Sequence, residues 1–263
     1  NIIRELKLMQ QSDDVSFITI DDDSFTLAPK KWLDEFCEAY GKEIAIPFKC
    51  NSPFAALTEE RVRQLKKAGC FAVKMGLESG NDDLRNSLLN KNVSEKCIVE
   101  TAGLLRKYKI RFQTFNMMGN PGESLSMALQ TYDLNRRIRP DFAWCSLLNP
   151  YPGTEIHQIC EDLGYLKKHP DYADGNYSYF TDSTLDLPDK QALFNLQKLL
   201  YVALLLRMPE GLLRFLVRLP LTPLYRLLYG MGMVWGLSRI NKDSLVSTVK
   251  LSLLQFSRYN RTK

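Results

Sequence analysis

Five short segments with strand chemistry alternate with helical stretches, and this alternation constrains the fold more than any other feature. Each segment is β-branched or aromatic and is bounded by polar residues, Gly or Pro, which is typical of buried strands. Strands that alternate with helices of this length predict parallel strands joined by right-handed crossovers. Two α/β folds stay open, a (β/α) barrel and an open doubly wound sheet. The segments are 15–20 (VSFITI), 44–49 (IAIPFK), 70–77 (CFAVKMGL), 110–118 (IRFQTFNMM) and 141–148 (DFAWCSLL).

The helical stretches carry capping residues at their expected ends. Over 58–69, Thr58 predicts the N-cap and Gly69 follows the last turn. Over 94–108, Ser94 predicts the N-cap of a second helix. The side chains that this second helix should bury are Cys97, Ile98, Ala102 and Leu105.

The chain opens on a charged helical pattern over 1–11, with no strand before it. In a βα repeat the first helix follows a first strand, so we expect that strand to precede Asn1 and the chain to begin inside its own domain. The opening stretch also lacks the apolar core of a signal peptide, so no signal peptide is expected there.

The composition indicates a globular protein kept under reducing conditions. Hydrophobic residues make up 45% and charged residues 25% of the chain, which excludes a disordered protein. The cysteines are scattered without a CxxC pair, so we expect free thiols and a cytoplasmic location. His157 and His169 are the two histidines of the sequence, and no zinc site is expected because no ligand spacing supports one. The cysteines are Cys37, Cys50, Cys70, Cys97, Cys145 and Cys160.

Charge is distributed unevenly along the chain. From Lys198 to Lys263 there are eleven Lys and Arg residues against Glu210 and Asp243, which gives +9. The whole chain carries +5, so residues 1–197 carry −4. A mildly acidic front joined to a basic, leucine-rich back indicates two parts with different roles. The expected division is a domain over 1–165, a linker over 166–190 and a helical region over 191–263.

Polar segments follow four of the five predicted strands. The carboxyl ends of parallel strands are where barrels and open α/β sheets place their sites, so these segments should gather at one rim. Glycines there would let backbone approach a ligand, and carboxylates there can accept hydrogen bonds from hydroxyl or ammonium groups. The segments are Asp21–Asp23, then Glu78, Ser79 and Gly80, then Gly119, Pro121, Gly122 and Glu123, then Pro150, Pro152, Gly153 and Thr154.

Each segment also has a purely structural interpretation. PGE and PGT sequences are most often turns before helices, and Ser79 or Asn81 could cap the helix that follows it. The three aspartates could be a solvated loop. Because three unpaired buried charges would be costly, at least one of them should face solvent or meet a cation. The joint arrangement on successive strands favours a ligand site over four independent turns.

Four stretches occur in the same order and with similar spacing as in the radical S-adenosylmethionine (SAM) superfamily: DDSF, LKKAGCFAVKMGLESGNDDLRNSLLNK, TFNMMGNPGES and NPYPGTEI. The chain resembles that family over about residues 1–165, and is most similar to the branch that often carries an upstream cobalamin-binding domain. The resemblance implies an α/β fold, a partial (β/α) barrel of parallel strands without its first strand, followed by an α-helical C-terminal region. It implies an enzyme that cleaves SAM at a 4Fe–4S cluster to start radical chemistry, with cobalamin as a further cofactor of that branch.

The resemblance also assigns residues to the cofactors. NMMGNPGE matches the family segment that packs against adenine, and the strand end with Glu78 and Ser79 matches the one near the ribose and methionine moiety. Asp22 and Asp23 fall on the family's DD-x-F, which faces the cofactor or substrate. The residues implied to bind the cofactor are Asp22, Asp23, Glu78, Ser79, Gly80, Asn116, Gly119, Pro121, Gly122, Glu123 and Pro152.

One departure from the family is plain in the sequence. The CxxxCxxC motif, whose thiolates hold the cluster, is absent from these 263 residues. In the family it lies just before the first helix, so we expect the cluster ligands upstream of Asn1 and a catalytically inactive chain without them.

The basic back of the chain predicts a helical region and a second candidate surface. Arg207, Arg214, Arg218 and Arg226 recur at helical intervals among leucines, and Pro209, Pro220 and Pro223 should break the region into short helices. A helical cap on the barrel is one interpretation. The other is peripheral contact with an anionic membrane on its inner face, with Trp235 and Tyr229 at headgroup depth and a lipid-like or other small-molecule substrate. Nucleic acid is not expected, because the arginines alternate with leucine.

Two other functions remain open from the residues alone. An apolar strand that ends in three aspartates is also similar to the metal-binding DxD element of nucleotide-sugar glycosyltransferases. That fold gives no role to the ESG, NPGE and PYPGT segments. The chain could also be a non-catalytic helical interaction fragment.

Overall fold

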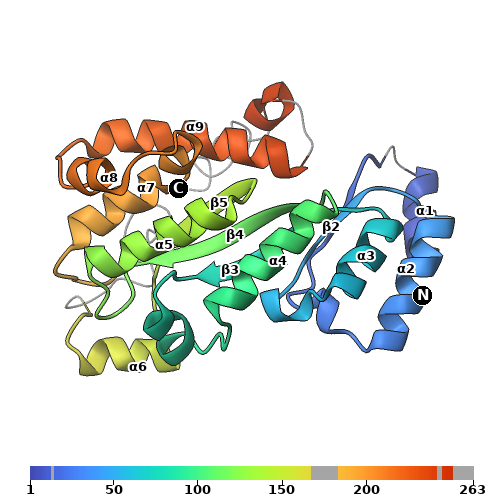
Figure 1. Ribbon diagram of the computed structural model, residues 1–263, viewed down its shortest axis with the longest axis horizontal. Helices are drawn as coiled ribbons and strands as arrows, with labels where there is room; N and C mark the ends of the chain where they lie inside the picture. The colour runs from blue at the N-terminus through green and yellow to red at the C-terminus, as the bar shows by residue number, and fades with distance from the viewer. Residues whose placement is uncertain (13–14, 167–182, 242–244, 251–263) are drawn as a thin grey trace. The chain divides into compact units, whose positions relative to one another are not determined.

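A computed structural model describes residues 1–12, 15–166, 183–241 and 245–250 (Figure 1). Five strands form one sheet in the order β1-β2-β3-β4-β5, and the pairs β1–β2 and β2–β3 are parallel. The order follows the chain without a reversal, which is the order within a (β/α) barrel and not that of a doubly wound sheet. The strands are β1 (Ile18–Ile20), β2 (Phe48–Asn51), β3 (Cys70–Glu78), β4 (Arg111–Met118) and β5 (Phe142–Leu147).

Helices separate the strands, so the α/β alternation expected from the sequence is confirmed. Helix α2, which the sequence pattern did not reveal, lies between β1 and β2. The helices are α1 (Ile2–Ser12), α2 (Lys30–Glu43), α3 (Glu59–Ala68), α4 (Glu95–Lys107), α5 (Leu125–Ile138), α6 (Glu155–Asp162), α7 (Lys190–Leu205), α8 (Glu210–Leu216) and α9 (Thr222–Asn241). Short helical turns span Phe25–Leu27, Phe54–Ala56 and Asp83–Leu88.

The chain divides into two compact units, and β3 and β4 run from one into the other. Unit 1 comprises Asn1–Gly76 and Val93–Thr114, and unit 2 comprises Leu77–Asn92 and Phe115–Lys263. The breaks after residues 76 and 114 fall inside β3 and β4, and the break after residue 92 lies just before α4, whereas the sequence pattern suggested a division at residue 165. The proposed linker over 166–190 falls mostly outside the described residues.

Unit 1 is held together by aromatic packing and by capped helices. Trp32 and Phe36 stack on α2 with ring centroids 5.4 Å apart, and the Tyr40 ring meets Phe48 of β2 at 4.8 Å. The expected N-cap of α3 is confirmed, because the Thr58 hydroxyl accepts a hydrogen bond from the Arg61 backbone N–H at 3.3 Å.

The expected cap of α4 is confirmed as well. The Ser94 hydroxyl accepts from the Cys97 N–H at 3.2 Å, and Gly69 ends α3 in the left-handed conformation with φ 101°. Three of the four side chains predicted to be buried on α4 are buried. The exception is Cys97, which is half-buried because it lies in the first turn.

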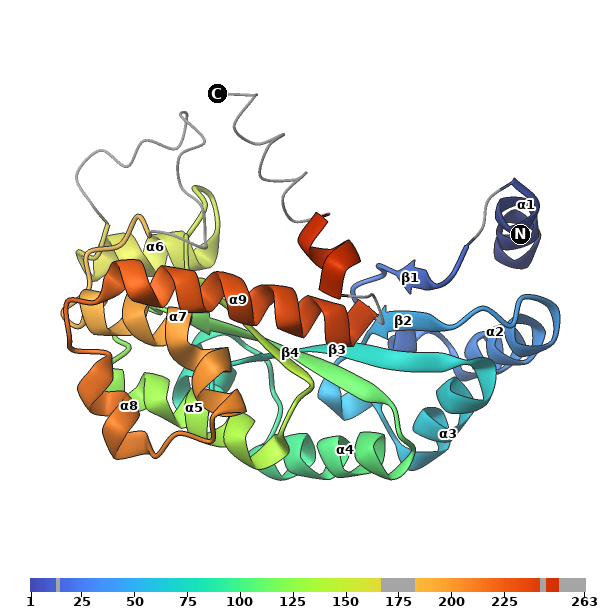
Figure 2. The same cartoon turned by 90° about the horizontal axis from the view of Figure 1, so that it is seen from above.

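Unit 2 packs its C-terminal helices on β5. Helices α7 and α9 run side by side, and both contact β5 (Figures 1 and 2). The Gln197 side-chain amide donates to the Cys145 carbonyl oxygen at 2.9 Å, and the Tyr201 hydroxyl donates to the Asp141 carbonyl oxygen at 2.6 Å. The back of the chain is therefore helical and docked on the sheet, as the sequence predicted.

The prolines act at helix ends. Pro209 precedes the first turn of α8, and Pro223 lies in the first turn of α9, where a missing N–H costs nothing. Consequently α9 continues for 20 residues and is longer than the short helices expected. Among the described residues, no helix combines the length and apolarity that a membrane span requires.

Candidate functional site

The carboxyl end of β3 places Glu78 in an unusual backbone conformation. Its φ is +61°, a left-handed value that costs an L-residue energy and is often retained at functional sites. The side chain is 18% exposed, and its carboxylate lies 2.9 Å from the Lys91 ammonium group. Glu78 is thus a half-buried carboxylate, held at a strand end by a strained turn and one cation.

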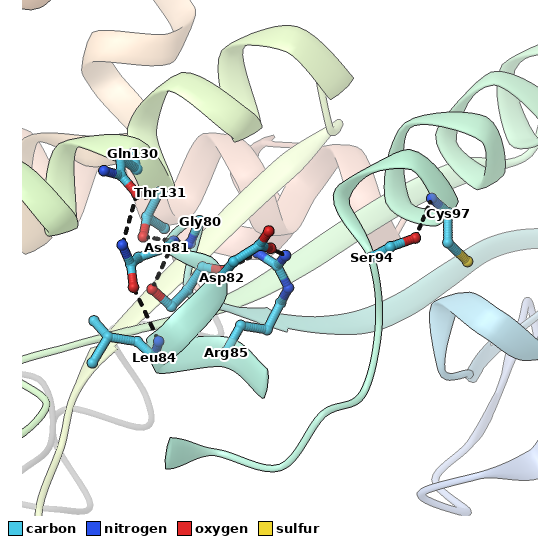
Figure 3. A network of polar contacts seen from close by, with 10 residues as sticks. Gly80, Asn81, Asp82, Leu84, Arg85, Ser94, Cys97, Gln130 and Thr131 are labelled. Atoms are coloured by element: carbon cyan, nitrogen blue, oxygen red, sulfur yellow. Dashed lines mark hydrogen bonds and ion pairs between the residues drawn. The ribbon is translucent and has the colours of Figure 1, made fainter. Parts of the chain in front are cut away.

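The next three residues form a compact turn within unit 2 (Figure 3). Ser79 is fully buried, and its hydroxyl accepts a hydrogen bond from the Asn81 N–H at 3.1 Å. The Asn81 side-chain oxygen accepts from the Leu84 N–H at 3.0 Å. Asn81 therefore caps the helical turn Asp83–Leu88, whereas Ser79 bonds the residue before it, so the capping interpretation of this segment holds for Asn81.

Gly80 is required by packing against helix α5. A Cβ atom placed on Gly80 would lie 2.2 Å from the Gln130 carbonyl oxygen and 2.5 Å from the Thr131 nitrogen. The Gly80 N–H also donates to the Thr131 hydroxyl at 2.8 Å, as Figure 3 shows. The missing side chain therefore admits α5, whereas the sequence suggested that it would admit a ligand.

Sequence reasoning missed Arg85, which fixes the loop from inside. Its guanidinium is fully buried, donates to the Ser79 carbonyl oxygen at 2.9 Å and pairs with Asp82 (Figure 3). A buried guanidinium that bonds the backbone immobilises the segment around it. The available signal was an Arg three residues after Asp82 in a short helical turn, a spacing that brings the two side chains together.

After β4, the carboxylate of Glu123 fixes a loop that contains two glycines by accepting three hydrogen bonds from it. Its Oε2 atom accepts hydrogen bonds from the Gly119 N–H at 2.7 Å, the Asn120 N–H at 3.0 Å and the Asn120 side-chain amide at 3.1 Å. Gly119 and Gly122 have φ of 80° and 77°, so both use the left-handed region that glycine adopts freely. Pro121 lies within this loop.

Burial sets the protonation of Glu123. The residue is 3% exposed, and desolvation raises the pKa of its carboxyl from 4.5 to about 7, although the three N–H donors oppose the shift. The carboxyl is therefore close to half-protonated near neutral pH.

Two buried oxygen atoms in this loop lack hydrogen bonds. Within the part of the chain that the structure describes, Oε1 of Glu123 and Oδ1 of Asn120 have no donor. Buried oxygen atoms are rarely left without partners, and such exceptions call for a missing water, ion or ligand. The loop can therefore accept hydrogen bonds from a bound molecule, which fits the donor-bearing adenosine part of SAM.

The Asn116 side chain links β4 to its neighbours. Its side-chain oxygen accepts from the Asn135 amide of α5 at 2.7 Å, and its amide donates to the Trp144 carbonyl oxygen at 2.8 Å. These bonds couple β4 to α5 and β5 on the buried side of the sheet. The assignment of Asn116 to the cofactor stays a prediction.

The opposite face of β4 and β5 carries a half-buried aromatic surface. Because side chains alternate along a strand, Phe115 and Met117 point away from Asn116, and Trp144 points away from Cys145. The Phe115 and Trp144 rings meet edge to face with centroids 6.3 Å apart. The period-two alternation of these strands was the sequence signal for this surface.

The segment after β5 is an exposed turn. Pro152 and Gly153 are both exposed, and the Thr154 hydroxyl accepts from the His157 N–H at 3.3 Å to cap α6. This geometry agrees with the turn interpretation, and a cofactor contact by Pro152 stays a prediction.

In unit 1, the three aspartates after β1 are all exposed. Asp21 pairs with the Lys74 ammonium group at 2.8 Å, and the Asp22 carboxylate accepts from the Ser24 N–H at 2.8 Å in a local turn. The expectation that one of them meets a cation or solvent is confirmed. The roles of Asp22 and Asp23 toward a cofactor stay predictions.

The described residues of this chain offer no ligand set for an iron–sulfur cluster or a chelated metal ion. Across the described ranges, no three Cys, His, Asp or Glu side chains come together as a metal site. Five of the six cysteines are buried, and burial raises the pKa of Cys37 and Cys160 to about 11, which disfavours the thiolate. Within these ranges Asp21, Asp22 and Asp23 form no group of three metal-binding side chains, and the glycosyltransferase alternative stays a prediction.

A model of the radical SAM superfamily matches residues 1–134. Among curated proteins, the chain is similar to an uncharacterized methyltransferase of Pyrococcus horikoshii, with 22% identity over 155 residues, 59% of this chain and 34% of the relative. It is 28% identical over 145 residues to bacteriochlorophyllide d C-12(1)-methyltransferase of Chlorobaculum tepidum, covering 54% of this chain and 31% of the relative. The chain thus spans about a third of the length of these relatives.

Solved structures show the same fold. The radical SAM methyltransferase TsrM from Kitasatospora setae, solved with cobalamin and a 4Fe–4S cluster, superposes with a TM-score of 0.53 at 18% identity. The match covers 66% of this chain and 36% of TsrM. At this level of identity the likeness concerns the fold alone.

Proposed function

The chain belongs to the radical SAM superfamily, and we propose that unit 2 binds the adenosine part of SAM for methyl transfer to a large apolar substrate. The observation that carries this proposal is the pair of buried acceptors without donors, Asn120 Oδ1 and Glu123 Oε1, in the loop after β4. The adenine amino group and the ribose hydroxyls of SAM are donors of the kind that these atoms lack. When bound, SAM supplies its methyl group or its 5′-deoxyadenosyl group.

The residues around the loop would hold and orient that ligand. Glu123 keeps Gly119 and Asn120 in one conformation, so the leftover acceptors are preorganised before binding. Glu78 offers a carboxylate to a ribose hydroxyl or an ammonium group, a strong charge-assisted bond at a half-buried position. Its strained backbone supports a functional role, because strain of this kind persists where it is used.

The protonation state of Glu123 would determine whether its Oε1 atom accepts or donates a hydrogen bond. As a carboxylate, Oε1 accepts a hydrogen bond, whereas the protonated carboxyl can donate one from this atom. With a pKa of about 7, raised by burial, both forms occur near neutral pH. Binding of a donor such as the adenine amino group should therefore favour the ionised form and release a proton.

The aromatic surface on β4 and β5 supports the proposed substrate class. Phe115, Met117 and Trp144 are half-buried on the face opposite to Asn116 and Cys145. Such a surface suits a flat, apolar molecule, since aromatic and thioether side chains pack well against rings. The relative from Chlorobaculum tepidum is named for a tetrapyrrole substrate, which supports a macrocyclic or similarly lipid-like substrate here.

The 4Fe–4S cluster and cobalamin are proposed as cofactors of the whole protein. We place the 4Fe–4S cluster outside the side chains of these 263 residues, because no cysteine cluster serves it in the described ranges. Cobalamin, present in the TsrM structure, is proposed as a further cofactor of methyl transfer. The full activity and the substrate are proposed for the whole protein, because this chain spans about a third of the length of its relatives.

Calorimetry with SAM and S-adenosylhomocysteine tests the proposal on residues 1–263. Asn120→Ala removes one leftover acceptor and should weaken binding by about 2–10-fold, the value of one hydrogen bond of about 0.5–1.5 kcal/mol. Gln158→Ala, which truncates an exposed amide on α6, should leave binding unchanged. The proposal is contradicted if the folded chain has no affinity for either ligand. It is also contradicted if Asn120→Ala binds both ligands as tightly as the wild type does. Binding of a manganese–nucleotide-sugar complex instead would favour a glycosyltransferase.

A further inference from the structure

Helix α9 has a well-defined buried face that docks on the sheet of unit 2. Tyr225, Gly232, Gly236 and Ile240 recur at helical spacing and are all buried. A Cβ atom on Gly236 would lie 2.1 Å from the Phe142 ring, so the helix backbone rests directly on β5. The Tyr229 hydroxyl also points inward, 3.5 Å from the Cys145 carbonyl oxygen. The half-buried Tyr229 thus turns its hydroxyl toward the protein, and its location at headgroup depth stays a prediction.

The other side of α9 is also apolar, although it is exposed. Leu224, Leu227, Met231 and Trp235 are 47%, 63%, 62% and 43% exposed. Their spacing of three and four residues places them in one stripe along the helix. We call these four residues the α9 stripe. A surface helix normally turns a polar face to water, so an exposed stripe of this kind indicates a partner.

Exposed apolar side chains are concentrated in the part of the sequence that contains this stripe. Of the nineteen large hydrophobic residues that the described ranges expose, twelve lie between residues 205 and 249. Scattered exposed leucines are ordinary, but a cluster on consecutive helices marks an interaction surface. Near the stripe in sequence are Leu206, Leu212, Phe215 and Leu221, on and beside α8.

Positive charge accompanies the apolar surface. Arg207, Arg218 and Arg226 are exposed. Among the described residues, their guanidinium groups make no ion pair or hydrogen bond. The acidic Glu210 is already paired with Arg214 at 2.9 Å. Residues 205–250 hold seven Lys and Arg residues against Glu210 and Asp243. The partner of this surface should therefore be both apolar and anionic.

We propose that α8 and the α9 stripe bind the surface of an anionic lipid bilayer. Exposed apolar side chains and exposed arginines on the same stretch of chain, in helices too polar to span, are features of interfacial helices that lie in the headgroup region. Trp235 lies in the stripe, and tryptophan prefers that depth. This inference is independent of SAM binding, since none of its residues belongs to the loop after β4.

Vesicle co-sedimentation of residues 1–263 tests the inference. The chain should sediment with vesicles of phosphatidylcholine and phosphatidylglycerol and stay in solution with phosphatidylcholine alone. Rising salt should release it, because attraction to an anionic surface is screened. Arg218→Glu with Arg226→Glu should weaken binding by roughly 10-fold or more, since each basic residue near the surface contributes about fivefold.

Two double variants distinguish vesicle binding by this surface from vesicle binding that depends on net charge alone. Lys31→Glu with Lys96→Glu makes the same change in net charge at exposed positions of α2 and α4, and should leave vesicle binding nearly unchanged. Leu227→Asp with Met231→Asp should abolish binding while the melting temperature stays near that of the wild type, because both side chains are exposed. Brominated lipids should quench tryptophan fluorescence in the wild type and much less in Trp235→Phe.

Three results would overturn the inference. The first is the absence of sedimentation with anionic vesicles at low salt. The second is binding that survives the two aspartate substitutions. The third is a chain that ignores vesicles but self-associates in sedimentation velocity until Leu227→Asp disperses it, which would make the α9 stripe a contact between copies.

Discussion

Gly80 and Gln130 approach each other so closely that a single methyl group would not fit between them. A Cβ atom on Gly80 would lie 2.2 Å from the Gln130 carbonyl oxygen, and the Gly80 N–H bonds the neighbouring Thr131 hydroxyl at 2.8 Å. Helix α5 is thereby fixed to the loop that carries Glu78. The position of the candidate carboxylate thus depends on a helix some fifty residues further along the chain.

Replacement of Gly80 by alanine should destabilise unit 2. The clash is with helix backbone, which cannot rotate away, so we expect a loss of about 1–3 kcal/mol in the free energy of unfolding. Gly103→Ala is the matched control, because an added Cβ on α4 would meet nothing within 4 Å. That substitution should stabilise by about 0.5–1 kcal/mol through helix propensity. Urea denaturation measures both, and equal effects would contradict the packing role of Gly80.

Glu123→Gln should change how stability depends on pH. Burial raises the pKa of this carboxyl from 4.5 to about 7, so the folded chain holds its proton more tightly than the unfolded chain. Stability should therefore fall as pH rises from about 4.5 to 7 and level off above it. Glutamine mimics the protonated form, so the variant should match the wild type near pH 4.5 and exceed it by up to about 3 kcal/mol at pH 8.

Denaturation of both proteins across this pH range measures the Glu123 effect. Asp162→Asn, which removes an exposed carboxylate on α6, serves as the control for the loss of one negative charge. Parallel profiles for the wild type and Glu123→Gln would show that Glu123 titrates normally.

Two glycines of α9 should respond in opposite directions to alanine. Gly236→Ala would force a methyl group into the Phe142 ring, where the nearest ring carbon is 2.1 Å away, and should cost about 1–3 kcal/mol. Gly230 is exposed with no atom within 4 Å of an added Cβ, so Gly230→Ala should stabilise by about 0.5–1 kcal/mol. Thermal melts of the pair check this, and a neutral Gly236→Ala would mean that α9 does not rest on β5.

The sequence revealed those features that depend on neighbours along the chain. Alternating strands and helices, and the caps at Thr58 and Ser94, follow from local chemistry that a single sequence records. The polar segments were recognisable for the same reason, since each directly follows a strand. Helix α2 was not predicted. It begins after Pro29 without a side-chain cap, and Trp32 and Phe36 pack on Phe25 and Phe48, which are contacts that the sequence does not show.

Features that depend on distant partners were not predictable. Gly80 looked like a ligand contact, and only the backbone of α5 shows why it must be glycine. The hydrogen bonds of Asn116 with Asn135 and the Trp144 carbonyl oxygen are likewise invisible in the sequence, and its assignment to the cofactor stays a prediction. A buried Arg85 also contradicts the usual exposure of arginine, and only the Ser79 carbonyl oxygen beside it explains the burial.

Glu78→Gly should separate stability from ligand binding. At φ +61° a glutamate is strained by roughly 1 kcal/mol, and glycine adopts this conformation freely. The lost pair with Lys91 is half-exposed and should offset less than about 1 kcal/mol. Unfolding stability should therefore stay the same or rise, while affinity for SAM falls because the carboxylate is gone.

Lys91→Ala is the matched control for Glu78→Gly. It removes the same ion pair but keeps both the carboxylate and the strained backbone, so it should bind SAM nearly as well as the wild type and be slightly less stable. Calorimetry and thermal melts on the two variants give the comparison. If Glu78→Gly keeps its affinity for SAM, the strained carboxylate has a structural role only. If that variant unfolds, the turn at the end of β3 depends on the Glu78 side chain for its stability. The strained backbone of Glu78 would then have no separate role in binding.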